Sequence, residues 1–253
     1  MKNITDFIKK YWITFLLLIL IIATYAFLAN NKILDPYLFP ETSKINESFS
    51  QNWKTLFLNM LASFKLLFPS LFVAVVIAII IGVPLGLNKS ARDTVLPIVY
   101  GFSVIPSILL SPFLLLLAPS LEWASRIMII YNVIWPTCFG IMNGIATIDS
   151  AYLDTAKTLE LTGFKKLYKV ILPAASPTAL SGFVGSLRGS FTVLIFAEMY
   201  GAKYGMGYFV KKSSDYGIFP NVWVGFIFLV IILVIVLRIF EALKDRILSW
   251  TID

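Results

Sequence analysis

The sequence predicts an all-α polytopic membrane protein with about six transmembrane helices. Three observations support this fold class. Of the 253 residues, 58% are hydrophobic and only 14% are charged, whereas an average soluble domain carries about 25% charged residues. Charge-free runs of the roughly 20 residues that cross a hydrocarbon core recur along the chain. Apolar residues fill these runs without alternation, which argues against the strands of a membrane barrel.

The composition also excludes several functions. The chain has one cysteine, Cys138, and no histidine, so an internal disulfide is impossible and metal sites built from His and Cys are not expected. We interpret the net charge of +7 as basic cytoplasmic loops and expect no nucleic-acid partner. We predict no catalytic residue and no metal ligand in this chain.

The first two predicted spans flank a polar segment. The first follows Lys9 and Lys10, is longer than the apolar core of a signal peptide and lacks a small-residue cleavage site, so we expect a retained helix. Residues 30–59 are predicted to form an external loop, in which Trp53, Leu56 and Phe57 have helical spacing and could lie along the interface. The first two spans cover 11–31 and 66–87.

The remaining spans are predicted at 95–121, 127–148, 172–197 and 217–237. Four prolines crowd the third span, where they should kink the helix and free carbonyl groups. Arg188 interrupts the fifth. Glycines spaced four apart, such as Gly140 and Gly144, are expected to bring helices together within the subunit rather than at a dimer seam. If the N-terminus is cytoplasmic, the inner loops hold twice as many Lys and Arg residues as the outer loops, which predicts that both termini are cytoplasmic.

The inner loop at 149–170 is the most structured polar part of the chain. Leu153, Ala156 and Leu159 form one short apolar stripe, and a second stripe begins at Phe164 after the break at Thr162-Gly163. This pattern predicts two short amphipathic helices joined at a bend. Two interpretations stay open from the residues alone: the apolar faces lie on the bilayer, or the first helix docks into a groove of a partner.

The same loop resembles the EAA loop of binding-protein-dependent ABC importer permeases. The family pattern is Glu-Ala-Ala, three residues, Gly, nine residues and Ile-x-Leu-Pro. This sequence keeps the spacing with Asp154-Thr155-Ala156, Glu160 and the run 170–173, and departs from the pattern at Asp154, Thr155 and Glu160. Because a glutamate does not favour the turn that the family glycine permits, Gly163 is expected to take over the bend.

Other stretches resemble the sulfonate, taurine and nitrate branch of that family, over roughly residues 35–250. They are Ile81 to Leu87, Val104 to Ser107, Ala197 to Ala202 and Gly205 to Tyr208. The resemblance implies a type I importer-like fold in a bacterial inner (plasma) membrane. The chain 1–253 would form one permease domain, divided into an N-terminal helix and external loop (1–60), a core (61–250) and a cytoplasmic coupling loop (149–171).

The resemblance further implies a mechanism and partners. Two permease copies, expected to be a homodimer, would each set the coupling helix, about residues 153–163, into one of two ATPase subunits. Those subunits would bind ATP and Mg²⁺, this chain would bind no cofactor, and an external binding protein would deliver the solute. Ala156→Glu is expected to uncouple ATP hydrolysis from uptake without harming the fold. The expected coupling residues are Leu153, Asp154, Thr155, Ala156, Lys157, Leu159, Glu160, Thr162, Gly163, Phe164 and Pro173.

Six further residues are candidates for the translocation pathway, because polar groups and freed carbonyls within spans tend to face cavities. Arg188 is expected either to meet an anionic solute or to pair with another helix, and Glu198 is more consistent with a structural role. The tentative set is Ser103, Pro106, Ser107, Asn132, Arg188 and Glu198.

Rival functions are weaker. The segment from Gly82 to Ser90 lacks the spacing of a phosphate-binding loop, so ATP hydrolysis is assigned to a partner. A secondary transporter driven by an ion gradient is the alternative, but the two halves show no convincing internal repeat. A membrane-embedded enzyme would need a convergent set of acids and bases, which the spans lack. The solute is expected to be a small anion or a vitamin precursor.

Overall fold

The computed structural model describes residues 2–251, with the side chains of residues 12–250. Every regular element in this part of the chain is helical, which confirms the predicted all-α class. The elements are α1 (Lys2–Asn30), α2 (Thr42–Leu87), α3 (Lys89–Ser103), η1 (Ser107–Leu110), α4 (Ser111–Leu117), α5 (Leu121–Ala146), α6 (Ser150–Thr158), α7 (Gly163–Lys166), the π-helix η2 (Leu167–Ile171), α8 (Leu172–Gly201), α9 (Met206–Asp215), α10 (Phe219–Ile247) and η3 (Ser249–Thr251).

Helix α5 is the centre of the bundle and packs along α2 on one side and α8 on the other. Small residues permit this close approach. A Cβ atom added to Gly86 would lie 2.8 Å from Ile145 Cβ, and one added to Gly144 would lie 2.6 Å from the carbonyl oxygen of Ala175. The glycines at 82, 86, 140 and 144 therefore serve packing within the subunit, as predicted.

The apolar helices agree with a membrane protein of about six crossings. Within the described residues, five helical segments are long and apolar enough to span a bilayer, and the pair α3 and η1–α4 would make a sixth if it counts as one span. The two members of this pair meet at 75°. The prediction of one span over 95–121 was therefore wrong in shape, although the kink lies among the prolines that predicted it.

Helix α2 corrects the predicted external loop at residues 30–59. It begins at Thr42 and continues for 46 residues, about 69 Å at 1.5 Å per residue, so residues 42–60 are helical and the true loop covers only 31–41. The first turns of α2 contact α10, where Ser48 Oγ donates to Asn221 Oδ1 at 2.6 Å. A search for charge-free runs misses such a helix, because polar residues outside the hydrocarbon form helices equally well.

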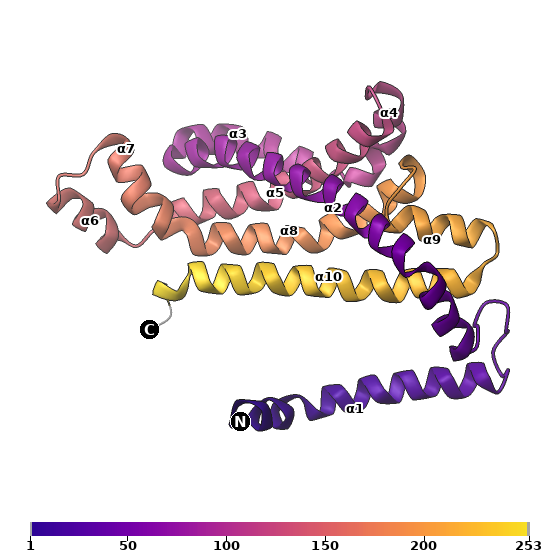
Figure 1. Cartoon of the computed structure of the whole chain (residues 1–253). Coiled ribbons are helices and arrows are strands. Elements are labelled where there is room, and N and C mark those ends of the chain that lie inside the picture. The colour runs from indigo at the N-terminus through magenta and orange to yellow at the C-terminus, as the bar shows by residue number, and fades with distance from the viewer. Residues whose placement is uncertain (1, 252–253) are drawn as a thin grey trace.

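The two ends of the bundle differ in character. Helices α6 and α7 lie at one end, together with the C-terminal end of α10 (Figure 1). At the other end, Tyr25 of α1 donates to the carbonyl of Pro40 at 2.9 Å, and Trp223 Nε1 donates to the carbonyl of Leu38 at 2.9 Å. These contacts tie the 31–41 loop to the end of α1 and to α10, while the rest of α1 stands apart from the bundle (Figure 1).

Candidate functional site

Helix α6 begins and ends on defined caps. Asp149 Oδ1 accepts a hydrogen bond from the Ala151 N–H at 2.9 Å, the usual arrangement at a helix N-terminus. At the other end, the Leu161 N–H donates to the Ala156 carbonyl and the Glu160 N–H donates to the Lys157 carbonyl, both at 2.9 Å. These are the two hydrogen bonds of a Schellman motif, so α6 is a short helix with fixed boundaries.

Glu160 holds the left-handed position of that motif, with φ at 52°. This is the position where the family pattern has glycine. The expectation that Gly163 would replace this turn was wrong: Gly163 also has φ at 52°, but it begins α7 instead. The helix consequently ends at Thr158, five residues before the expected limit. The predicted pair of short helices joined near Thr162 is confirmed.

The second helix continues directly into the membrane. Helix α7, the π-helix η2 and α8 follow one another without a gap, so residues 163–201 form one helical body. A π-helix carries a wider turn than an α-helix and is rare outside functional positions. The loop is therefore joined to α8 by a helical backbone without a gap.

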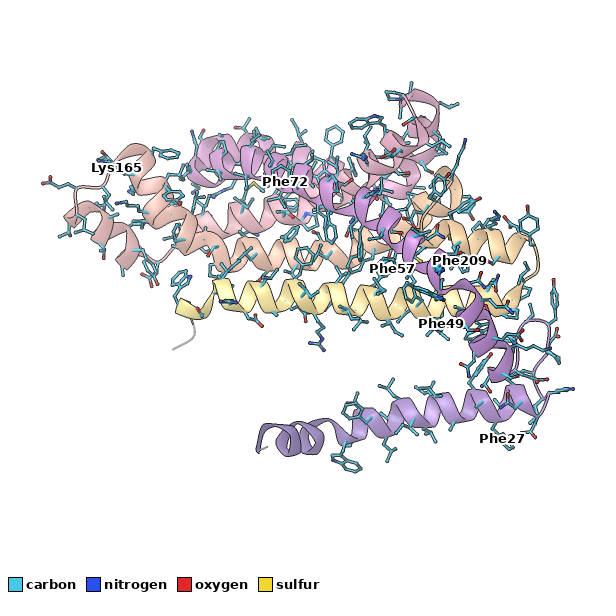
Figure 2. All side chains as sticks on the ribbon, in the orientation of Figure 1. Phe27, Phe49, Phe57, Phe72, Lys165 and Phe209 are labelled. Atoms are coloured by element: carbon cyan, nitrogen blue, oxygen red, sulfur yellow. The ribbon has the colours of Figure 1, made fainter. Side chains whose placement is uncertain are left out.

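The outer surface of this loop is apolar and exposed. Leu159 is 63% exposed and Phe164 is 77% exposed, and the Phe164 ring stacks on Tyr168 with centroids 6.4 Å apart. Lys165 projects from the same end of the bundle (Figure 2). We call Leu159, Phe164 and Tyr168 the distal surface. Single exposed apolar residues are ordinary in proteins, but a cluster rimmed by lysines is typical of a docking surface.

Ala156 does not belong to the exposed surface. It is fully buried, and its carbonyl accepts the bond that closes α6. A glutamate at this position would bury a charge, so the burial of Ala156 argues against the expectation that Ala156→Glu leaves the fold intact. Small size at this position serves packing inside the chain.

The other expected coupling residues surround α6. Leu153 is half-buried, while Asp154, Thr155 and Lys157 are exposed. Lys157 Nζ lies 2.8 Å from Asp154 Oδ1, and such an exposed pair adds little stability. Thr162 and Pro173 are also exposed. Thr162 directly precedes α7, and Pro173 is the second residue of α8.

Four of the six pathway candidates meet at the proline break. Ser103, Pro106, Ser107 and Asn132 line a pocket of about 310 Å³ between the α3–η1 bend and α5. Pro106 has no N–H to offer the carbonyl four residues earlier, and the Tyr131 hydroxyl donates to that carbonyl, on Phe102. Tyr131, Trp135 and Phe139 give the pocket an aromatic wall, and Trp135 stacks on Phe102 with centroids 6.2 Å apart.

Glu198 lies elsewhere and holds backbone in place. Its side chain is buried, and Oε2 accepts a hydrogen bond from the Gly207 N–H at 2.8 Å. Neighbouring amides of the same turn are also bound, since Met206 N–H donates to Ser63 Oγ at 3.0 Å. A Cβ at Gly205 would lie 2.4 Å from Glu198 Oε1. The glutamate therefore caps the unpredicted helix α9, the structural role that the sequence favoured.

Arg188 pairs with another helix. Its Nη2 atom lies 3.6 Å from Glu241 Oε1 on α10, yet its side chain is 72% exposed. Sequence reasoning raised both an ion pair and a solute contact for this residue, and the structure places it in an ion pair.

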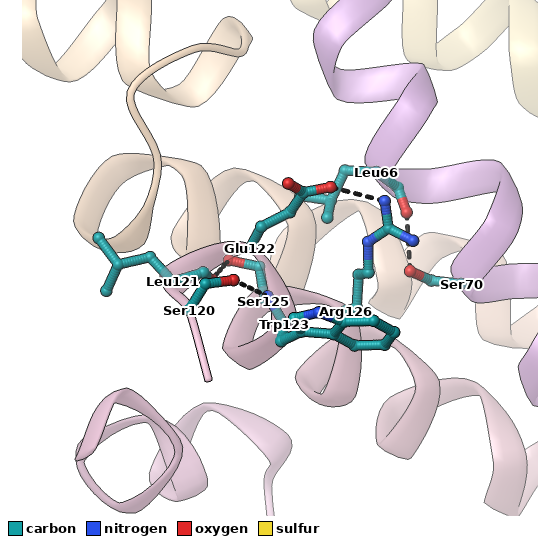
Figure 3. A network of polar contacts seen from close by, with 8 residues as sticks. All are labelled: Leu66, Ser70, Ser120, Leu121, Glu122, Trp123, Ser125 and Arg126. Atoms are coloured by element: carbon teal, nitrogen blue, oxygen red, sulfur yellow. Dashed lines mark hydrogen bonds and ion pairs between the residues drawn. The ribbon is translucent and has the colours of Figure 1, made fainter. Parts of the chain in front are cut away.

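Sequence reasoning missed a cavity that has a volume of about 830 Å³. It lies between α2, the start of α5 and the end of α8, with Lys65, Lys203 and Glu198 among its lining residues. Beside it, Arg126 Nη2 lies 2.6 Å from Glu122 Oε1, and Ser120 Oγ accepts from the Trp123 N–H (Figure 3). In the sequence, only the charged residues at the ends of the predicted spans pointed to this cavity.

Comparison with known proteins decides the family. Residues 74–250 match the model of the binding-protein-dependent transport system inner membrane component. The chain belongs to this family. The match runs from the last third of α2 to η3, so it contains the α6–α7 loop and all six pathway candidates, while α1 and the first two thirds of α2 lie outside it.

Two curated permeases are similar to this family member. It is 25% identical over 165 residues to a putative aliphatic sulfonates transport permease of Bacillus subtilis, covering 65% of this chain and 60% of that protein. It is 25% identical over 167 residues to the taurine transport system permease of Escherichia coli, covering 66% and 60%. The alignments thus span about 60% of the length of these relatives.

Solved structures support the fold of the permease family. A chain of the inward-facing MetNI methionine ABC transporter superposes with a TM-score of 0.57 at 18% identity, covering 78% of this chain and 97% of that one. A second crystal form of the same transporter gives a TM-score of 0.55 at 19% identity.

Proposed function

We propose that this chain is the permease subunit of an ATP-driven importer for a small anionic solute. Family membership supports the transport role, and the relatives named for aliphatic sulfonates and taurine support the solute class. Two copies would enclose the pathway, and a binding protein would deliver the solute at the end that carries α9. The end that carries α6 and both chain termini would be cytoplasmic.

The observation that carries the coupling proposal is the capped helix α6 beside the exposed distal surface. A helix of fixed length fits a preformed groove, and an ATPase subunit that binds ATP and Mg²⁺ would supply that groove. Leu159 and Phe164 would bury their exposed rings and methyl groups there. Ala156 would pack the buried face of α6 against the rest of the chain.

Movement of α6 and α7 would be transmitted to the membrane helices along the backbone. A shift of α6 and α7 reaches α8 through the π-helix η2, and α8 is locked to α5 where Gly140 and Gly144 meet Thr178 and Ala175. Tightly packed helices move as bodies rather than deforming continuously. Closure of the ATPases would therefore swing α8 and α5 together and change which end of the pathway is open.

The experiment is uptake into vesicles by the complex assembled with its ATPase and binding protein. Leu159→Glu should abolish coupling, lowering uptake at least about tenfold, because a charge cannot be buried in an apolar groove without a large cost. Ser90→Glu, an exposed substitution at the α2–α3 turn, is the matched control and should transport normally. Equal uptake by both variants would contradict the docking proposal.

The alternative, an ion-gradient transporter, makes the opposite prediction. Uptake by the chain alone, driven by a proton or sodium gradient and insensitive to ATP, would favour it. The proposed function requires that uptake stop when the ATPase or ATP is left out.

A further inference from the structure

Two arginines share one carboxylate on the surface formed by α8 and α10. Arg238 Nη1 donates to Glu241 Oε2 at 3.2 Å, and Arg188 Nη2 lies 3.6 Å from Glu241 Oε1. The Phe183 and Phe240 rings, 5.7 Å apart, hold the two helices together beside this group. We call Arg188, Arg238 and Glu241 the arginine pair cluster.

The cluster carries one positive charge in excess, and its guanidinium groups are open. Arg188 and Arg238 are 72% and 78% exposed, whereas Glu241 is only 27% exposed beneath them. Each guanidinium has five N–H donors, and the carboxylate engages few of them. One helical turn before Arg188, the space around Gly185 is empty within 4 Å of an added Cβ, so a ligand has room to approach.

The charged side chain of Arg188 needs a polar neighbour. Arg188 lies in the interior of α8, one of the helices long and apolar enough to cross the membrane. Charged side chains in such segments face a partner, a cavity or an ion rather than lipid tails. One carboxylate cannot neutralise two guanidinium groups, so the cluster retains an attraction for an anion.

We propose that the arginine pair cluster binds a singly charged oxyanion, with Arg188 and Arg238 as its two contacts. Guanidinium forks match the paired oxygens of sulfonate, carboxylate and phosphate groups. Glu241 is a positioning residue: it holds both arginines at one opening and, as a resident anion, keeps the affinity low enough for the solute to leave, as transport requires. This proposal rests on the proposed function for its biological meaning and on the cluster geometry for its chemistry.

The test uses the purified full chain in nanodiscs of phosphatidylcholine, with methanesulfonate as the probe. Saturation-transfer NMR on its methyl group measures weak binding, and dimethyl sulfone, which has similar shape and no charge, is the control ligand. Arg188→Gln and Arg238→Gln should each weaken methanesulfonate binding by about fivefold or more. Arg188→Lys should fall between wild type and glutamine, because it keeps the charge and loses the fork.

Glu241→Gln separates this proposal from a purely structural ion pair. It should tighten methanesulfonate binding by about threefold or more, since it removes the resident negative charge. Arg92→Gln, on α3 beside Asp93, removes the same charge elsewhere and should leave binding unchanged. Gel filtration and circular dichroism confirm that each variant is folded.

A lipid phosphate could supply the same oxyanion chemistry. Nanodiscs containing phosphatidylglycerol, followed by native mass spectrometry, test this source. Lipid retention that needs both arginines, without methanesulfonate binding, supports the oxyanion site and assigns it to lipid. Binding that is equal for dimethyl sulfone, or unaffected by both arginine variants, overturns the site, and weaker binding by Glu241→Gln overturns the role given to Glu241. Since none of these measurements involves the ATPase, their failure leaves ATP-driven uptake standing, and the converse also holds.

Discussion

At the scale of single residues, two backbone positions shape the regions that matter for function. Glu160 adopts the left-handed conformation that ends α6, which costs an L-residue other than glycine about 1 kcal/mol. The Tyr131 hydroxyl donates to the Phe102 carbonyl at the bend where Pro106 supplies no N–H. The first was a departure from the family pattern visible in the sequence, whereas the second needed the fold to bring α5 beside α3.

Substitutions at Glu160 should separate turn strain from charge. Glu160→Val places a β-branched residue in the left-handed region, and should raise amide hydrogen exchange around Leu161 several-fold. Glu160→Gly should exchange no faster than wild type, because relief of strain offsets the greater flexibility of glycine. Faster exchange in the glycine variant alone would contradict the Schellman geometry.

Loss of the Tyr131 hydroxyl should destabilise the bend between α3 and η1. Tyr131→Phe removes the hydrogen bond to Phe102 and is expected to lower the free energy of unfolding by about 1 kcal/mol. Tyr100→Phe, on a neighbouring ring that stacks on Phe139, should have a smaller effect. Thermal unfolding in detergent compares the two, and an unchanged midpoint for Tyr131→Phe would show that the bend does not need this bond.

At the scale of elements, charge-free runs located the cores of α1, α5, α8 and α10, because the bilayer demands about 20 apolar residues in a row. The same criterion missed the first turns of α2 and all of α9, because these segments carry charged residues such as Glu47 and Lys211. Proline positions showed that the third span would bend but not by how much. The cavity beside Lys65 could not be predicted, since it depends on how three helices meet.

The seam between α5 and α8 offers a sharp test at this scale. Gly144→Ala puts a methyl group 2.6 Å from the Ala175 carbonyl oxygen, so the helices must separate, at a cost of about 1–3 kcal/mol. Gly101→Ala, with nothing within 4 Å, should be neutral or slightly stabilising. Unfolding midpoints should fall by several degrees for the first variant only, and an equal response would contradict the packing.

At the scale of the whole molecule, the chain is a helical bundle with the exposed α6–α7 loop at one end. In the proposed mechanism, the distal surface, α6, the π-helix and α8 would form one mechanical path, and Gly144 would link it to the central helix α5. Nothing in this path requires chemistry from the chain itself. The proposed function therefore depends on a separate ATPase subunit that binds α6.

The most direct measurement is site-specific photo-cross-linking in membranes of cells that also express the ATPase. A photoreactive phenylalanine analogue at position 159 should cross-link to the nucleotide-binding subunit, and the yield should change when ATP is trapped. The same analogue at position 72, an exposed phenylalanine of the apolar part of α2, should cross-link to lipid only. Cross-links from position 159 to lipid alone, with the ATPase present, would contradict the account.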